Sequence, residues 1–176
     1  MRKLIIIAFA SAAMLAMTGC DEINSGLIID WYPVNVYLKV TDGNGTDLLD
    51  PENPDNMIDG ATITFQGKTY QSSREREDLY KGPETKDYLA QIYGLLLVKD
   101  SILMHEDAEG YSLAFGEIDG SEDMDEDLVV TLSDGTTGTI HYHCSDHNNK
   151  KISCKRSWKF NGKKHDGNIF TFVISK

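Results

Sequence analysis

The sequence lacks the short motifs that mark common enzyme families. Its 176 residues contain no G-x-S-x-G nucleophile elbow, no H-E-x-x-H zinc helix, no phosphate-binding glycine loop and no dinucleotide fingerprint. Ser, His and Asp all occur, but catalytic triads and glycosidase carboxylate pairs are recognised by geometry, which sequence spacing does not provide. We therefore expect a protein that is not an enzyme and has no cofactor. The alternative within the enzyme class is a hydrolase without a recognisable motif.

Positive charge is also scarce, with 17 Lys and Arg against 28 Asp and Glu and a net charge of −11. This balance argues against sequence-independent binding to nucleic acid, which needs clustered basic side chains. The charge is uneven, however: residues 20–149 carry 7 bases against 27 acids (−20), whereas residues 150–176 carry 8 bases against one acid (+7). We expect the C-terminal bases either to pair with acidic loops of the same domain or to contact an anionic surface outside the protein. This predicted anionic-partner patch consists of Lys150, Lys151, Lys155, Arg156, Lys163 and Lys164.

A hydrophobic run long enough to span a membrane is missing. The apolar stretch Leu4–Met17, broken by Ser11, has about 14 residues, whereas a spanning helix needs about 20. It follows Arg2 and Lys3 and ends at small residues, which is typical of a signal peptide. The remaining chain is long enough, and at 40% hydrophobic content apolar enough, to bury one core.

The ending "MTGC" of this segment resembles the signal of bacterial lipoproteins. The resemblance implies cleavage before Cys20 and diacylation of that cysteine; the alternative is an ordinary cleavage site with an incidental cysteine. We expect a signal peptide at 1–19, a lipidated tether at 20–30 and a single domain at 31–176. The anchor would hold the protein on a membrane outside the cytosol.

Asp21 and Glu22 follow the predicted lipidation site directly. This acidic pair resembles the surface-export signal of Bacteroidetes lipoproteins, which implies an outer-membrane protein displayed at the cell surface. In enterobacteria an Asp beside the lipidated cysteine is instead associated with inner-membrane retention. A third interpretation is a solvated tether without targeting information.

Period-two alternation of apolar and polar residues recurs along the body of the chain and predicts half-buried strands. The apolar positions are Val34, Val36, Leu38 and Val40; Ile63 and Phe65; Tyr111, Leu113 and Phe115; Leu128, Val130 and Leu132; Ile140, Tyr142 and Cys144; Ile152, Cys154, Trp158 and Phe160; and Phe170, Phe172 and Ile174. Turn residues at Gly67, 133–136 and 161–168 separate these runs. The pattern predicts an all-β domain, an antiparallel sandwich or barrel. Residues 72–87 read as a loop or short helix, and 88–98 as a buried strand or a helix, with Gly94 favouring a strand with a bulge.

The segments "VYLKVTDGNGTDLLDPENPDN" and "ITFQGKTYQ", with the C-terminal hairpin and the signal, resemble small Bacteroidetes lipoproteins of unknown function. What this resemblance implies is an immunoglobulin-like or related β-sandwich on the cell envelope. It carries no catalytic motif.

Cys144 and Cys154 are the two cysteines that remain beside Cys20. Both fall on the apolar faces of their predicted strands, ten positions apart across a polar connection. We expect a structural disulfide between them, worth about 2.5–3 kcal/mol in the chain-entropy model. The alternative is a reactive or metal-binding thiol pair.

Two segments raise the question of a metal site. His141, His143 and His147 surround Cys144, but His141 and His143 should project from the face opposite the thiol, near Lys155 and Lys159 of the next strand. We expect surface histidines; a zinc site would need a carboxylate such as Asp146.

The second segment contains the oxygen donors Asp42, Asn44 and Asp47 and lacks the glycine and glutamate positions of an EF-hand, which favours a turn. The acidic segment Glu117–Asp127 reads as a solvated loop or a weak calcium site.

The preferred hypothesis is a lipid-anchored, non-catalytic binding module of the cell envelope with an unknown protein or glycan ligand. Trp31 and Tyr32, just after the tether, are candidates for its contact surface. The second hypothesis is an envelope protein that binds calcium or zinc.

Overall fold

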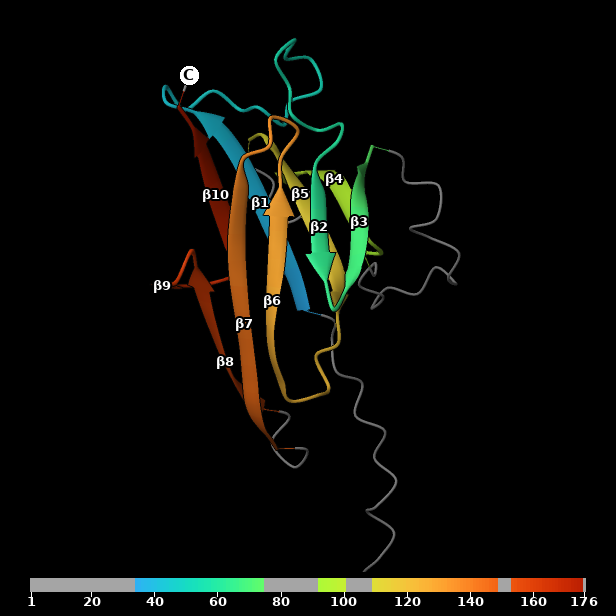
Figure 1. Ribbon diagram of the computed structural model, residues 1–176, viewed down its shortest axis with the longest axis vertical. Helices are drawn as coiled ribbons and strands as arrows, with labels where there is room; N and C mark the ends of the chain where they lie inside the picture. Colours follow the sequence, from blue (N-terminus) through green and yellow to red (C-terminus); the bar gives the residue numbers. More distant parts are fainter. Residues whose placement is uncertain (1–33, 75–91, 101–108, 149–152, 176) are drawn as a thin grey trace, which may run out of the picture. The chain divides into compact units, whose positions relative to one another are not determined.

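The computed structural model describes residues 34–74, 92–100, 109–148 and 153–175 of the chain (Figure 1). Several predicted features lie outside the described residues. They are the signal peptide, the tether with Cys20, the residues Trp31, Tyr32, Lys150 and Lys151, and most of the segment 72–91. Residues 31–176 form one compact unit.

Ten strands make up the described chain, so the prediction of an all-β fold is confirmed. They are β1 (Val34–Asp42), β2 (Thr62–Phe65), β3 (Lys68–Ser73), β4 (Leu95–Lys99), β5 (Tyr111–Ile118), β6 (Met124–Thr131), β7 (Thr137–Asn148), β8 (Ser153–Phe160), β9 (Lys163–His165) and β10 (Ile169–Ile174). None of the described residues belongs to a helix with the length and hydropathy of a membrane span.

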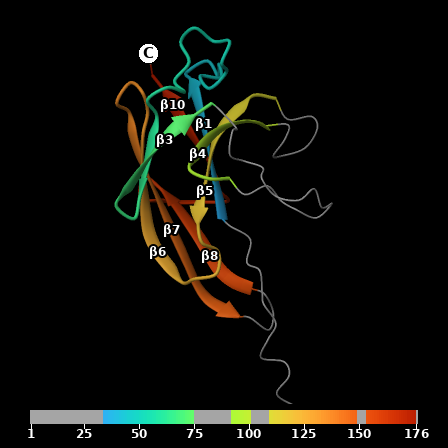
Figure 2. The ribbon, with the colours of Figure 1, turned by 90° about the vertical axis from the view of Figure 1, so that its right-hand side faces the viewer.

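The strands form one mixed, curled sheet in the order β10-β1-β5-β4-β3-β2-β6-β7-β8-β9 (Figures 1 and 2). Two neighbouring pairs, β1 with β10 and β3 with β4, are parallel, so the expectation of a wholly antiparallel arrangement is wrong. The first parallel pair arises because β1 lies between β5 and the last strand of the chain. The second pair is short, consisting of Ser72 with Leu95 and Ser73 with Leu96.

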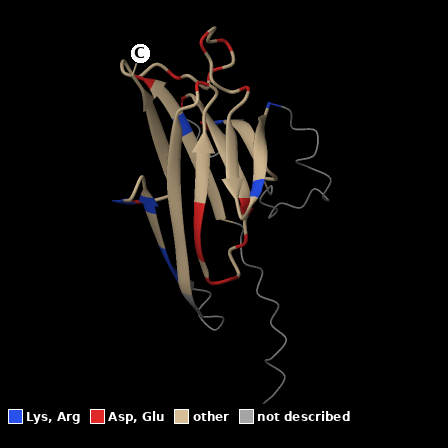
Figure 3. Ribbon diagram, in the orientation of Figure 1, with Lys and Arg blue, Asp and Glu red and all other residues tan. Residues whose placement is uncertain are grey.

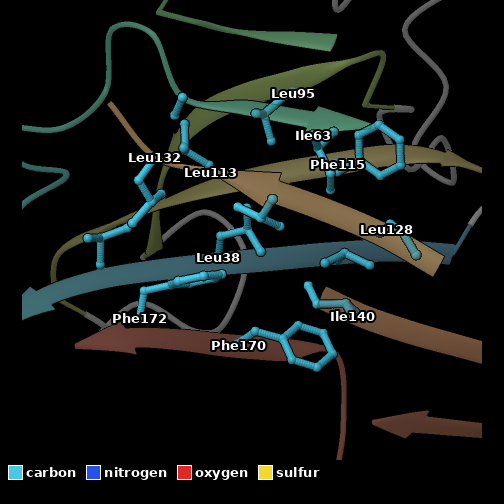
Figure 4. Close-up of a cluster of buried hydrophobic side chains, with 14 of the residues drawn as sticks. Leu38, Ile63, Leu95, Leu113, Phe115, Leu128, Leu132, Ile140, Phe170 and Phe172 are labelled. Carbon is cyan, nitrogen blue, oxygen red and sulfur yellow. The ribbon is translucent and has the colours of Figure 1, made fainter. Parts of the chain in front are cut away.

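The core fills the inside of the curl, because each long strand turns alternate side chains inward. In β1, for example, Val36, Leu38 and Val40 are fully buried while the residues between them are partly exposed. Figure 4 shows how side chains from β1, β2, β5, β6, β7 and β10 meet in this cluster. Full burial of each aliphatic or aromatic side chain contributes about 1.5–3 kcal/mol to stability.

Aromatic side chains connect the two ends of the sheet across the core. The Phe172 ring of β10 lies 5.1 Å from the Phe160 ring of β8, and the Phe170 ring lies 5.6 Å from that of Trp158. Gly138 on β7 makes room for this contact, since a Cβ there would lie 2.5 Å from Phe172. β10 is therefore held against β7 and β8 by side-chain packing.

The predicted turns at Gly67 and 133–136 are confirmed. Gln66–Gly67 and Asn161–Gly162 both have positive φ angles, as two-residue hairpin turns with the twist of the sheet require. Leu132 and Thr136 close the predicted 133–136 turn through a backbone hydrogen bond of 2.8 Å. Residues 161–168, predicted as a connection, also contain the short strand β9. Gly94, with φ +69°, precedes β4, so the strand interpretation holds for 95–98.

The acidic segment Glu117–Asp127 is only partly a loop, which corrects the prediction. Glu117 belongs to β5, where its Oε1 accepts the Gly94 N–H at 2.6 Å. Asp125 and Asp127 belong to β6, with their side chains exposed and the histidines of β7 opposite. Pairing with β7 explains why a run of carboxylates forms a strand here.

Replacing Gly138 by Ala tests the close contact with Phe172. The added Cβ would lie 2.5 Å and 2.8 Å from two atoms of that ring, so the ring must move. We expect the free energy of unfolding to fall by about 1–3 kcal/mol, measured by urea denaturation. Gly43→Ala is the control, because nothing lies within 4 Å of its added Cβ. Equal losses in the two variants would contradict the packing argument.

Candidate functional site

The outer face of β6–β9, opposite the core, carries an ordered row of charges. Asp127 of β6 pairs in register with His141 of β7, His141 with Lys159 of β8, and Lys159 with Lys164 of β9. These side chains share one face because the neighbouring positions Leu128, Ile140 and Trp158 are buried. Figure 3 shows the acidic part of β6 and the basic positions of β8 and β9 on either side of β7.

His141 lies between two carboxylates of β6. Its Nδ1 is 2.9 Å from Asp127 Oδ1, and its Nε2 is 3.0 Å from Asp125 Oδ1, which is also 3.5 Å from His143 Nδ1. Carboxylates only accept hydrogen bonds, so both contacts are satisfied when the ring carries two protons. These contacts are partly exposed, with side-chain exposures of 29% for His141 and 67% for Asp125.

The predicted placement of the histidines on the face opposite Cys144 is confirmed, as is the neighbouring Lys159. The carboxylates that contact them are not predicted, because the segment Glu117–Asp127 reads as a solvated loop or a weak calcium site. The period of two that starts at Leu128 extends back to Asp125 and Asp127. The side chains of Asp146 and His147 lie outside the described residues. Within the described part of the chain, no three His, Cys, Asp or Glu side chains are arranged to hold a metal ion.

The segment Asp42–Asp47 forms an inter-strand turn, as predicted. Asp42 Oδ1 accepts the backbone N–H groups of Thr46 and Asn44, both at 2.8 Å, and these bonds hold the pKa of Asp42 below its ordinary value. Asp47 accepts the N–H of Leu49 at 2.7 Å and that of Tyr111 at 2.8 Å. The carboxylates proposed as calcium ligands therefore bind backbone donors here.

No disulfide joins Cys144 to Cys154, so this prediction is wrong, although the expected closeness is confirmed. The sulfur atoms lie near 3.3 Å apart, beyond the roughly 2.05 Å of a covalent bond. The register explains the offset: Cys144 pairs directly with Arg156, and the β7–β8 ladder shifts between Ser145 and Asn148. The two cysteines are thus diagonal neighbours.

The surroundings of the Cys154 thiol favour its protonated form. Burial raises the pKa of Cys154, and the Cys144 thiol raises it further. Burial likewise raises the pKa of Tyr142, and the neighbouring Cys144 thiol raises it further. Arg156 is the nearby cation and acts in the opposite direction on both groups. A reactive cysteine needs a lowered pKa, so Cys154 does not have the environment of a nucleophile.

A buried carboxylate at Asp100, just after β4, was not predicted. Its side chain is fully enclosed, accepts a hydrogen bond from Ser112 Oγ at 2.6 Å and forms an ion pair with Lys39 Nζ at 2.6 Å. Gly110 lies against this group and against Asp47, since a Cβ there would lie 3.3 Å and 2.9 Å from their carboxylate oxygens. The ion pair connects β1 to the end of β4 and to β5. No motif around "VKDS" indicates it.

The described residues of the predicted anionic-partner patch lie on two faces of the sheet, because side chains alternate along a strand. Lys155 and Lys164 lie on the outer face with Lys159, whereas Arg156 and Lys163 occupy the alternate positions, opposite Cys144 and Phe160. Lys159 belongs to the outer set although the predicted patch omitted it. Its register with both His141 and Lys164 identifies it.

Replacing Lys39 by Ala tests the buried ion pair. The change leaves the Asp100 carboxylate enclosed with Ser112 as its remaining side-chain partner. We expect a loss of about 2–3 kcal/mol in the free energy of unfolding. This is less than the 3–5 kcal/mol typical of fully buried pairs, because the Lys39 side chain is 31% exposed. Adding Asp100→Asn should recover part of the loss. Equal destabilisation by the control Lys68→Ala would refute the assignment.

Comparisons with known proteins identify no relative: no family model, no curated protein and no solved structure matches this chain.

Proposed function

We propose that the protein is a lipid-anchored, non-catalytic binding module of the bacterial cell envelope. Its contact surface is the basic part of the β6–β9 outer face, and its partner is an anionic protein or glycan. The observation that carries this proposal is the position of Lys159 and Lys164, which are direct register partners on adjacent strands. Neighbouring strands lie about 4.8 Å apart, so one phosphate or carboxylate group can contact both ammonium groups.

The charge distribution supports an external partner over internal neutralisation. Among the described residues, Lys159 makes no ion pair, because His141 separates it from the carboxylates of β6. Lys164 lies 3.9 Å from Asp166, but these two side chains are 86% and 96% exposed, and such surface pairs contribute little. The ammonium groups therefore remain hydrated and accessible to an anion.

We also propose that Cys20 carries the lipid anchor and that the protein is located in the outer membrane, at the cell surface. The basis is the signal segment 1–19 with its "MTGC" ending, and the resemblance to Bacteroidetes lipoproteins. A tether of residues 20–30 spans up to about 35 Å when extended, which would let the domain reach partners away from the bilayer.

For the fold class, we propose an immunoglobulin-like or related β-sandwich. Its support is the weak connection at β3–β4, where two residue pairs join the group β10-β1-β5-β4 to the remaining strands. Side chains from the two groups pack against each other in the core, as the rings of Phe65 and Phe115 do edge-on at 5.8 Å.

The basic surface is tested by Lys159→Glu/Lys164→Glu. We expect at least a tenfold loss of affinity for heparin, used as an anionic probe, since two attractive contacts become repulsive. The native protein should elute from heparin at a higher salt concentration than the variant. Lys68→Glu/Lys99→Glu is the matched control, with the same change in charge at exposed positions of β3 and β4. Equal elution of the two variants, or binding insensitive to salt, would reject the surface.

The anchor is tested separately by Cys20→Ser. Removing the thiol removes the site of acylation, so we expect the protein to leave the membrane fraction and to lose incorporation of labelled palmitate. Cys154→Ser should remain membrane-bound. Palmitate incorporation into the Cys20→Ser chain would disprove lipidation at this residue.

A further inference from the structure

The two edges of the sheet differ in how they are protected. β9 has three residues, two of them lysines, and such short, charged edges discourage pairing with other chains. β10 has six residues, "IFTFVI", with no charge, proline or glycine. Its outer side chains include Ile169 and Val173, which are 36% and 62% exposed. β10 therefore has the sequence of a strand that pairs on both sides, although β1 is its single partner among the described strands.

Alternate residues of β10 direct their backbone N–H and C=O groups toward β1. Tyr37 of β1 donates its N–H to the Asn168 carbonyl at 2.9 Å, so the parallel ladder continues through Phe170, Phe172 and Ile174. The alternate residues Ile169, Thr171 and Val173 direct their N–H and C=O groups to the other side. No other strand of the described chain forms hydrogen bonds with these groups. The unpaired backbone groups and the exposed apolar side chains thus belong to the same residues.

We propose that β10 is a self-association edge, to which a second copy of this chain adds its own β10 in antiparallel orientation. A two-fold axis at Thr171 places Thr171 opposite its equivalent and Ile169 opposite Val173 of the second copy. In an antiparallel ladder these three are the hydrogen-bonded pairs, each exchanging two N–H···O bonds. The same register brings the exposed Ile and Val side chains together on the outer face. This inference is independent of the envelope function.

Charge complementarity favours this antiparallel pairing with a second copy. The chain before β10 carries Lys163, Lys164 and Asp166, a net positive charge, whereas the other end of β10 lies beside Asp42, the register partner of Ile174. Antiparallel pairing places the basic end of each copy beside the acidic end of the other, so the two-fold axis produces this contact twice. A parallel pairing would instead bring like charges together. The paired strands contain no charged residue, so they add no repulsion at the axis.

Cysteine cross-linking of the purified full chain tests this register. Thr171→Cys should cross-link to itself with a short bismaleimide and give a band at about twice the mass of one chain. Two differently tagged chains, Ile169→Cys and Val173→Cys, should cross-link when coexpressed. Val129→Cys is the control, because Val129 is 41% exposed but lies on the interior strand β6; the unmodified chain gives the background from the native cysteines.

Sedimentation equilibrium of the full chain in detergent gives the second measurement. Val173→Lys should weaken dimerisation at least tenfold, while Val129→Lys, equally charged, should leave it unchanged; circular dichroism confirms that both keep their sheet. A native chain that is monomeric throughout, no cross-link at Thr171, or equal weakening by the two lysine variants would overturn the proposal. A monomer that instead pairs with an extended peptide would assign the edge to a different occupant and equally reject self-association.

Discussion

The contact of β10 with β7 and β8 is the interaction on which the rest of this structure depends. Two residue pairs between β3 and β4 join the group β10-β1-β5-β4 to the remaining strands of the curled sheet. The sheet is therefore closed around the core mainly by side-chain packing. Phe170 and Phe172 supply that closure by packing against Trp158 and Phe160, over the space that Gly138 leaves. Because β1 lies between β5 and β10, the first strand of the chain pairs directly with the last. Contacts so distant in sequence predict slow folding, since a large loop must close before they form.

Period-two alternation was sufficient to locate most strands, because it reports which face of a strand is buried. It does not report which strand lies next, so the parallel pairings and the place of β1 could not be read from it. The apolar segment before Lys99 illustrates a second limit. β4 is buried on both faces, with Leu95 in the main core and Leu96 in a smaller cluster, and a strand of that kind has no alternation to detect.

The candidate site shows the same division between local and long-range information. The shared face of His141 and His143 follows from their spacing alone and was predicted. The carboxylates that contact them come from another strand, and the Lys39–Asp100 pair joins residues 61 positions apart. Acidic β6, histidine-bearing β7 and basic β8–β9 are adjacent, so the contrast between the acidic body and the basic C-terminal segment becomes a gradient across one face. The local composition indicates an acidic and a basic segment. The order of the strands shows where the acidic and basic parts of this face meet.

The parallel pairing of β1 and β10 also has a mechanical consequence. Because the strands run in the same direction, the start of β1 and the end of β10 lie at opposite ends of the pair. A pulling force applied to the chain before Val34 and after Ile174 would act along the strands and load their hydrogen bonds in shear, all at once. Peeling apart a hairpin, by contrast, breaks its bonds one after another. The domain is thus built to resist tension between its two ends.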